Sequence, residues 1–363
     1  MGSVRKSRNG RYEARWYDPD GRQHSQTFRK KANADRHVRA MEDAKDRGSY
    51  IDLQKGRTTP FRRVAEEWLA TTEHLKPKTR EGYKNILDYH LLPSFGHLSI
   101  ARIEHRTIDQ FLAGLEGAEG TKRNVFRVLD MVMKYAVRKG VIGVNPTTRA
   151  DRPKATNHHA DDDLRVLTVQ QVAALADAIG RQYELLVTFA AYTGMRAGEI
   201  GALRVKDLEL RAKAKRVTVR ESVSDVNGHL EFVRPKNGRV RKVALPAFLV
   251  EPLAEAVEGK GQEELVFTGE QGGTLRHHNF YGRHFKPAVR AALPEELHSL
   301  RFHDLRHTCA SLLIKQEVHP LAVSRHLGHS SIQITMDRYG HLFPDEQEAV
   351  ATALDDMHMK GTG

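Results

Sequence analysis

Two histidines near the C-terminal end invite a metal-binding interpretation. His303 and His307 stand four residues apart in the stretch HDLRH, so a helix would place both rings on one face. Zinc proteases use this spacing, but they need a glutamate after the first histidine, and Asp304 stands there instead. Arg306 between the histidines would also repel a metal cation. A zinc hydrolase is therefore only a remote alternative, and the sequence predicts no metal site.

The same stretch suits the binding of a phosphate group. His303 and Arg306 share a helix face at i, i+3 spacing. Arginine binds phosphate bidentately and stays charged, which suits the stabilisation of a pentacoordinate phosphorane. Arg196 follows a predicted helix end at Gly194, from where its side chain could reach into a cleft. Tyr339 lies beyond the last apolar stretch, and a hydroxyl held there could attack an electrophile.

Two further residues complete the set of candidates. Lys236 precedes an Asn-Gly pair that predicts a hairpin turn, and His329 follows Gly328 at a predicted helix end. Each residue alone is weak evidence, because a lysine at a turn is usually solvated and a histidine at a helix end usually makes a hydrogen bond there. Their order along the chain is the informative feature.

Taken together, these residues resemble the catalytic motifs of the tyrosine recombinases, the phage integrase family. The resemblance is carried by the phrases TGMRAGEI, HDLRHTCASLL, LGHSSI and TMDRYGHLF. It covers about residues 165–345 and implies an enzyme that cleaves and rejoins DNA.

The resemblance implies a role for each phosphate-binding residue. Arg196 and Arg306 would clamp the scissile phosphate, while His303 and His329 would donate hydrogen bonds to its oxygens. His303 would also be able to take the tyrosine proton.

It likewise implies the roles of nucleophile and acid. Tyr339 would become a 3′-phosphotyrosine, and Lys236 would protonate the leaving 5′-oxygen as general acid. The same predicted hairpin offers Lys242, Arg239 and Arg241 as alternatives, but the context Pro-Lys-Asn-Gly best matches the family's lysine.

Three other residues have supporting interpretations. Glu199 resembles the family's acidic residue after the first arginine, and His307 resembles a second supporting residue. Cys309 is the only cysteine, so an intramolecular disulfide is excluded, and we expect this residue to lie on the buried side of its helix.

The sequence indicates no need for ATP or a metal ion. The chain shows no phosphate-binding loop of P-loop type and no carboxylate cluster for Mg²⁺, and a phosphotyrosine keeps the energy of the broken bond. We therefore expect no cofactor.

The charge of the chain favours a polyanionic partner. The net charge is +12 and the sequence pI is about 9.7. Residues 1–58 hold fifteen Lys or Arg against eight Asp or Glu, a local net charge of +7. Neutralisation of phosphates by such a surplus releases counterions, so double-stranded DNA is the expected partner.

Residues 1–58 are predicted to be a small basic α+β domain. Residues 11–17 alternate aromatic and polar side chains and 23–28 form a partner strand, with a helix over 33–47. We expect Trp16 and Tyr17 to pack the sheet onto the helix. The domain resembles the arm-type DNA-binding domain of larger integrases. The residues expected to contact phosphates are Arg5, Lys6, Arg11, Arg15 and Arg22.

Residues 59–150 are predicted to be an all-helical domain that resembles the family's core-binding domain. Apolar residues recur at helical spacing, as in Phe61, Val64, Ala65 and Trp68. Basic residues on the outer faces could bind a DNA backbone. These candidates are Lys78, Arg80, Lys84, Lys122 and Arg123.

A polar stretch over 151–163 is predicted to be a linker, followed by a catalytic domain over 164–349 and a tail over 350–363. The catalytic domain is expected to be mainly helical with a small antiparallel sheet, including strands over 216–221, 230–233 and 239–245. The fold class is thus multi-domain, with α+β, all-α and mixed parts in that order.

The resemblance also implies partners and location. It implies a homotetramer on core and arm sites, with possible exchange of C-terminal segments, a host DNA-bending protein and an excision directionality factor. The absence of a signal sequence or a long apolar run predicts a cytoplasmic, nucleoid-associated protein in a bacterial host. The alternatives are a telomere resolvase or type IB topoisomerase, which share the chemistry, and a DNA-binding regulator without catalysis.

Overall fold

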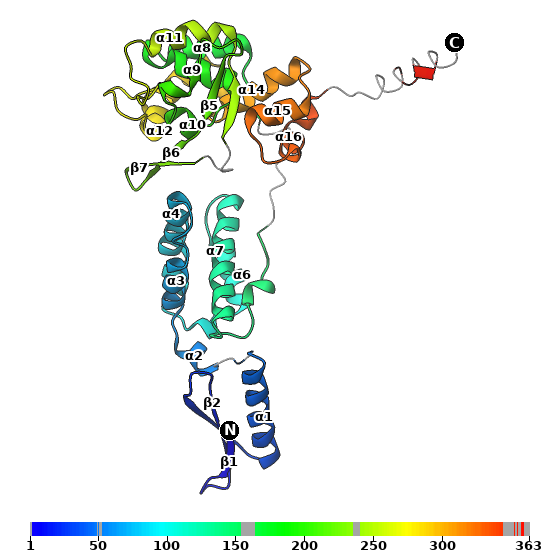
Figure 1. Ribbon diagram of the computed structural model, residues 1–363. Helices are drawn as coiled ribbons and strands as arrows, with labels where there is room; N and C mark the ends of the chain where they lie inside the picture. Colours follow the sequence, from blue (N-terminus) through cyan, green and yellow to red (C-terminus); the bar gives the residue numbers. More distant parts are fainter. Residues whose placement is uncertain are drawn as a thin grey trace. The chain divides into compact units, whose positions relative to one another are not determined.

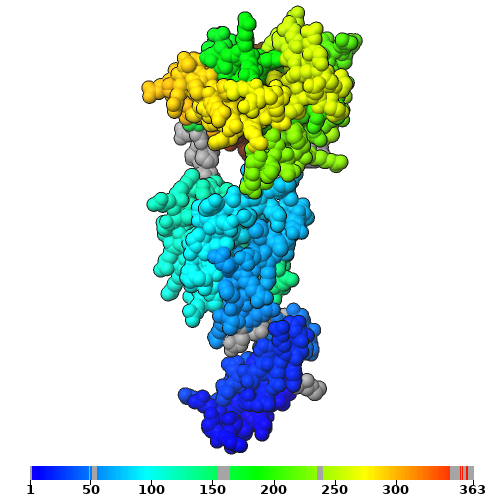
Figure 2. Space-filling view, turned by 90° about the vertical axis from the view of Figure 1, so that its left-hand side faces the viewer, coloured from blue at the N-terminus to red at the C-terminus, as the bar shows by residue number. Residues whose placement is uncertain are grey.

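The chain folds into two compact units, residues 1–157 and 158–363. In this computed structural model the described residues are 2–48, 50, 53–153, 164–234, 240–343, 352, 354, 357 and 358. The first unit runs from blue to green-cyan and the second from green to red (Figure 1 and Figure 2). The predicted linker therefore lies largely outside the described residues, as do most of the tail and Lys236.

The first unit begins with a three-stranded antiparallel sheet in the order β1 (Ser3–Lys6), β2 (Tyr12–Tyr17) and β3 (Gln23–Phe28). Gly10 and Gly21 adopt positive φ angles of 77° and 80° in the two connecting turns, a conformation that glycine adopts without steric cost. Helix α1 (Lys31–Asp46) lies along one face of this sheet (Figure 1). The small core between them is formed by Ala14, Trp16, Ala34 and Val38.

Trp16 packs the N-terminal sheet onto α1, as expected, but Tyr17 does not. Trp16 is buried against α1, and its indole N–H donates to the hydroxyl of Tyr50 at 2.9 Å. Tyr17 is 46% exposed, because successive side chains of a strand point to opposite faces. Tyr17 therefore shares the open face of the sheet with Arg15.

The remainder of the first unit is helical, as predicted. Its main helices are α2 (Leu53–Thr58), α3 (Phe61–Ala70), α4 (Pro77–Ile86), α5 (Leu92–Phe95), α6 (His105–Gly114) and α7 (Glu119–Arg138). A π-helical turn over Leu87–Leu91 joins α4 to α5. The apolar face of α7 packs with α3 and α4, and Phe61, Trp68 and Leu129 are buried in the shared core.

The second unit is mainly helical around a small sheet. Its longer helices are α8 (Val169–Ala178), α9 (Arg181–Thr193), α14 (Asp304–Lys315), α15 (Pro320–Leu327) and α16 (Ile332–Tyr339), and its shorter ones are α10 (Ala197–Gly201), α11 (Val250–Ala256), α12 (His277–Phe280) and α13 (Lys286–Ala292). Helix α14 is buried on almost every side and packs against α9 (Figure 1). Cys309 lies in this buried helix, as expected, and is 2% exposed.

The strands of the second unit pair differently from the prediction. β4 (Leu208–Glu209), β5 (Arg216–Val219) and β8 (Arg241–Ala244) form one antiparallel sheet, and β6 (Ser222–Val226) pairs with β7 (His229–Val233) in a separate hairpin. The predicted hairpin joined 230–233 directly to 239–245. That pairing is wrong, because β7 has β6 as its partner and β8 has β5.

Candidate active site

An open pocket of about 530 Å³ in the second unit collects most of the predicted chemical residues. They come from four places in the chain that the fold brings together: the α9–α10 junction, the start of α14, the turn after α15, and α16. The residues lining the pocket are Arg196, His303, Arg306, His307, His329, Ser330, Ile334, Arg338 and Tyr339.

Arg196 is placed by the junction of two helices. Helix α9 ends at Gly194, which has a φ of 60°, and α10 begins immediately after Arg196. A Cβ at position 194 would come within 2.5 Å of Leu327 and 3.1 Å of the Cys309 sulfur, so only glycine fits there. The backbone N–H of Arg196 donates to a Glu199 carboxylate oxygen at 2.9 Å, and its guanidinium donates to the other oxygen at 3.0 Å.

Glu199 is a buried carboxylate shared by two arginines. Its side chain is 1% exposed, and Arg241 donates to both of its oxygens at 2.8 and 2.7 Å. Burial alone would raise the pKa of Glu199, but the hydrogen bonds and charge of Arg241 and Arg196 outweigh it and lower the pKa to about 2. Glu199 is therefore ionised at neutral pH and holds Arg196 in place.

Arg306 is a buried guanidinium with unused hydrogen-bonding capacity. It is 3% exposed, and its Nη1 donates to the carbonyl of Gly194 at 2.7 Å. Its Nη2 is buried and has no hydrogen-bond partner within the described part of the chain. Burial and the charge of Arg196 lower the pKa of Arg306 to about 10, so it still carries its charge at neutral pH. A buried donor without a partner is costly, which indicates that the pocket is built to receive an anion.

The two histidines of the HDLRH stretch have different surroundings. His303 stands just before α14, and partial burial together with the charge of Arg306 lowers its pKa to about 4. His307 is 4% exposed, and burial and the neighbouring His303 lower its pKa to about 3. Both rings are therefore neutral at pH 7. His307 Nδ1 lies 2.7 Å from the Tyr339 hydroxyl, so that nitrogen is already engaged by a neighbour.

Tyr339 is the last residue of helix α16, and its side chain is buried. The residue is 1% exposed. Burial raises the pKa of its hydroxyl to about 12, although the charge of Arg306 acts in the opposite direction. Its ring stacks against that of His329, with the two rings 9° from parallel.

His329 is placed by a left-handed residue. Gly328 ends α15 with a φ of 71°, and His329 Nδ1 lies 2.8 Å from the hydroxyl of Thr335 in α16. Burial and the charge of Arg306 lower the pKa of His329 to about 4. With Nδ1 engaged by Thr335, the other ring nitrogen is left for a ligand.

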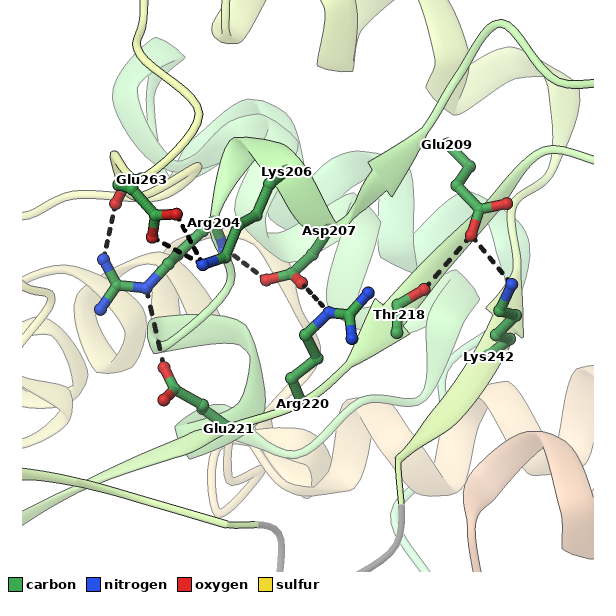
Figure 3. Close-up of polar contacts among 9 residues, drawn as sticks. All are labelled: Arg204, Lys206, Asp207, Glu209, Thr218, Arg220, Glu221, Lys242 and Glu263. Atoms are coloured by element: carbon green, nitrogen blue, oxygen red, sulfur yellow. Dashed lines mark hydrogen bonds and ion pairs between the residues drawn. The ribbon is translucent and has the colours of Figure 1, made fainter.

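Lys236 lies outside the described residues, but two of its three alternatives are engaged elsewhere. Arg241 is bound to Glu199. Lys242 forms an ion pair with Glu209 at 3.1 Å on the sheet (Figure 3). Arg239 lies outside the described residues, as Lys236 does.

Two residues with a part in the site were not predicted to have one. Arg338 lines the pocket, and its Nη2 lies 3.4 Å from His307 Nε2. Arg241 was considered only as an alternative lysine equivalent, yet it binds Glu199. Nothing local in the sequence distinguishes these two arginines from the many surface arginines of the chain.

The predicted DNA-contacting residues all belong to the first unit. Arg5, Lys6, Arg11 and Arg22 are exposed around the N-terminal sheet. Several of the others form ion pairs with carboxylates nearby in the sequence. These pairs are Arg15–Glu13, Lys78–Glu81, Arg80–Glu73, Lys84–Asp88 and Lys122–Glu119.

Comparison with known proteins identifies the family. The family described as "Phage integrase family" matches residues 165–346, "Phage integrase, N-terminal SAM-like domain" matches 60–115, and "Phage integrase, N-terminal domain" matches 1–47. The ICEBs1 integrase of Bacillus subtilis is 28% identical over 381 residues, covering 98% of this chain and 100% of that protein.

Solved structures share the fold. The Tn1549 transposon integrase in complex with transposon right end DNA has a TM-score of 0.65 at 18% identity, covering 83% of this chain and 100% of that one. A lambda integrase tetramer bound to a Holliday junction has a TM-score of 0.58 at 18% identity, covering 90% and 95%.

The chain belongs to the phage integrase family. It is a tyrosine site-specific recombinase, an enzyme class that integrates and excises mobile DNA. Within the described residues, no helix has both the length and the apolar character needed to cross a membrane.

Proposed function

We propose that Tyr339 cleaves one DNA strand by attacking a backbone phosphate held in the pocket. The phenol oxygen forms a bond to phosphorus, and the bond from phosphorus to the 5′-oxygen breaks, which leaves a 3′-phosphotyrosine and a free 5′-hydroxyl. The observation that carries this proposal is the buried Tyr339 hydroxyl in the same pocket as the unpartnered Nη2 of Arg306, as far as the described residues extend. Rejoining reverses the two steps with another strand's 5′-hydroxyl.

Arg196 and Arg306 are the proposed clamp for the non-bridging phosphate oxygens. Both are charged side chains lining one pocket, and an anion between them would give Arg306 the partner that it lacks among the described residues. His329, anchored by Thr335, would add a hydrogen bond to the same phosphate. Charge that develops on the phosphorane would thus meet donors that are already in place.

His303 is the proposed acceptor of the tyrosine proton. A pKa of about 4 leaves its ring neutral at pH 7, so a ring nitrogen has a lone pair to accept the proton. Lys236 is the proposed general acid that protonates the 5′-oxygen. The engagement of Arg241 and Lys242 with carboxylates elsewhere supports the choice of Lys236.

His307 is proposed to orient the nucleophile. A guanidinium can only donate hydrogen bonds, so Arg338 favours the tautomer in which His307 Nε2 accepts. In that tautomer Nδ1 carries the hydrogen and donates to the Tyr339 oxygen. The phenol's own proton is then free to point toward a base, and the developing phenolate keeps a hydrogen bond.

The other parts of the chain are proposed to hold the DNA. We assign 1–58 to arm sites, 59–150 to core sites, 151–163 to a linker, 164–349 to catalysis and 350–363 to exchange between protomers. The basic residues around the N-terminal sheet and on α4 and α7 support the first two assignments. The tetramer and DNA seen with relatives support a tetramer on two DNA sites. A host DNA-bending protein, a directionality factor and a nucleoid location belong to the same proposal.

Covalent trapping on DNA tests the proposal. Suicide duplexes carrying the attachment site are incubated with the protein in EDTA and separated on a denaturing gel. The native chain should form a protein–DNA adduct, and Tyr339→Phe should bind the duplex but form none. Tyr17→Phe serves as the matched control and should form the adduct normally. Adduct formation by Tyr339→Phe would contradict the assignment of the nucleophile.

The same gel separates the alternatives. DNA binding without an adduct in any variant would favour a non-catalytic regulator. Relaxation of supercoiled plasmid that carries no attachment site would favour a topoisomerase, and formation of hairpin ends would favour a resolvase.

A further inference from the structure

Arg241 makes a bidentate contact with Glu199 close to the pocket, although it does not line the pocket. Both of its terminal nitrogens donate to Glu199, and its side chain is 14% exposed. Bidentate pairs of this kind fix both partners in orientation as well as in distance. Glu199 in turn binds the backbone and the side chain of Arg196. Arg241, on β8, therefore helps to hold the guanidinium of Arg196 indirectly, through Glu199.

The same arginine also lies against the turn that carries His329. A Cβ added to Gly328 would come within 2.6 Å of the Cδ and Nε atoms of Arg241, and Gly328 has a φ of 71°. Glycine at this position therefore serves two needs: the left-handed backbone and the passage of the Arg241 side chain. The Nε of Arg241 is buried and has no hydrogen-bond partner in the described part of the chain. Burying this donor without a partner costs free energy, which the other contacts of Arg241 must offset.

We propose that Arg241 is a positioning residue for strand cleavage, acting through Arg196 and His329. This proposal rests on the proposed function of these two residues as phosphate ligands. Arg241 joins β8, the α9–α10 junction and the α15–α16 turn, and so fixes the spacing between Arg196 and His329. The geometry of a phosphate clamp depends on that spacing.

The charge of Arg241 has a second effect on the same clamp. Glu199 is ionised, and its charge is shared between Arg241 and Arg196. Without Arg241, both carboxylate oxygens would be left to Arg196, which would be drawn toward Glu199 and neutralised. Arg241 therefore keeps the guanidinium of Arg196 available to the phosphate.

Two substitutions at position 241 and one at Glu199 test this inference. Single-turnover cleavage of a suicide duplex should fall by about 10²-fold in Arg241→Met and by less in Arg241→Lys, because an ammonium cannot bind both carboxylate oxygens. The double variant Arg241→Met with Glu199→Gln should cleave faster than Arg241→Met alone, because the carboxylate that captures Arg196 is removed. DNA affinity in gel shifts should change little.

Cleavage measured well below the melting temperature of each variant distinguishes positioning from simple destabilisation. A cleavage loss in Arg241→Met that disappears when the variant is fully folded would come from instability and would overturn the inference, and so would a double variant that cleaves no faster than Arg241→Met. Thermal melting of each variant shows whether it is folded. If Arg241→Met does not fold, the comparison is made between Arg241→Lys with and without Glu199→Gln. Lys242→Met, at the next position and paired with Glu209, is the matched control and should cleave like the native chain.

A sulfur-substituted duplex identifies the step that is affected. A 5′-bridging phosphorothiolate has a leaving group that needs no protonation. Arg241→Met should remain slow on this substrate, whereas Lys236→Ala should recover. Recovery of Arg241→Met would mean that Arg241 acts on the leaving group and not on the clamp. Failure of the proposed function is recognised separately, by adduct formation in Tyr339→Phe.

Discussion

Basic and acidic side chains meet in two regions of the second unit, with a different balance of charge in each. In and beside the sheet, the cations are matched by carboxylates: Lys206 pairs with Glu263 at 2.6 Å and Arg220 with Asp207 at 2.9 Å (Figure 3). Arg216 and Lys242 both pair with Glu209. At the pocket, Arg196 and Arg241 share Glu199, while the polar contact of Arg306 is a backbone carbonyl. The sheet network is nearly balanced in charge, and the pocket carries an excess of positive charge.

The comparison shows that ion pairs have different consequences when they are exposed and when they are buried. Exposed pairs are screened by solvent and contribute little to stability, so the sheet network keeps this surface soluble and its cations occupied. At the pocket, Arg306, Glu199 and Tyr339 are buried, and the surplus positive charge remains as an affinity for an anion. Charge balance and burial, more than the number of arginines, therefore indicate which region binds phosphate.

The largest effect is expected from removing the guanidinium of Arg306, whose Nη2 has no hydrogen-bond partner among the described residues. Arg306→Gln should lower single-turnover cleavage by about 10²–10³-fold, as loss of a transition-state donor does in other enzymes. Arg220→Gln, which removes a guanidinium from the sheet network, should change the rate by no more than about twofold, because exposed pairs matter little. Equal losses in the two variants would contradict the contrast between the regions.

A smaller effect, on stability, is expected at the shared carboxylate. Glu199→Gln removes the charge between two arginines in a buried site and should lower the free energy of unfolding by about 3 kcal/mol. Glu209→Gln, its counterpart on the sheet, should lower it much less, because the pairs of Glu209 are screened by solvent. Urea unfolding of the full-length variants measures both. A larger cost at Glu209 would show that the sheet network has the greater structural role.

The pH dependence of stability should come from the pocket. The folded pKa of His307 is about 3 against a reference of 6.5, so its contribution to stability is complete above about pH 6.5 and is lost as the pH falls toward 3. Between pH 7 and 5 the native chain should lose about 1–2 kcal/mol more stability than His307→Asn does. Urea titrations at the two pH values provide the test, and identical losses would mean that His307 titrates normally.

The smallest effect is expected at the exposed pair beside the sheet. Lys206→Met breaks the ion pair with Glu263 and should leave the free energy of unfolding nearly unchanged, because solvent screens this pair. Cleavage of the suicide duplex should match that of the native chain within error. A loss of cleavage would mean that this side of the sheet contacts DNA, and the sheet would no longer serve as the neutral counterpart of the pocket.

The order of motifs predicted which residues would come together, but not how they would be joined. Arg196, His303, Arg306, His329 and Tyr339 line one pocket because each stands at a helix end or on a buried helix face. Periodicity and glycine positions indicate such places locally. The contact between Arg241 and Glu199 spans 42 residues and depends on strand pairing, which no local pattern encodes.

The strand error has a specific cause. Two Asn-Gly pairs follow each other, at 227–228 and 237–238, and the prediction used only the second. Asn227 and Gly228 have φ angles of 52° and 82°, the combination typical of a tight two-residue hairpin turn, and they join β6 to β7. Using the first pair would have predicted this hairpin and assigned the strand over 241–244 to another partner. The exposure of Tyr17 is a similar case, because strand alternation alone separates it from Trp16.

The burial of Tyr339 has a consequence for the protein when it is not at its target. A recombinase that searches a chromosome meets countless phosphodiesters, and a reactive phenolate on its surface would put each of them at risk. Here Tyr339 is 1% exposed, and burial raises the pKa of its hydroxyl to about 12, so the phenol stays protonated at neutral pH. If Tyr339 is the nucleophile, as we propose, it would stay inert while the protein travels along DNA, and cleavage would require a phosphate that reaches the buried hydroxyl.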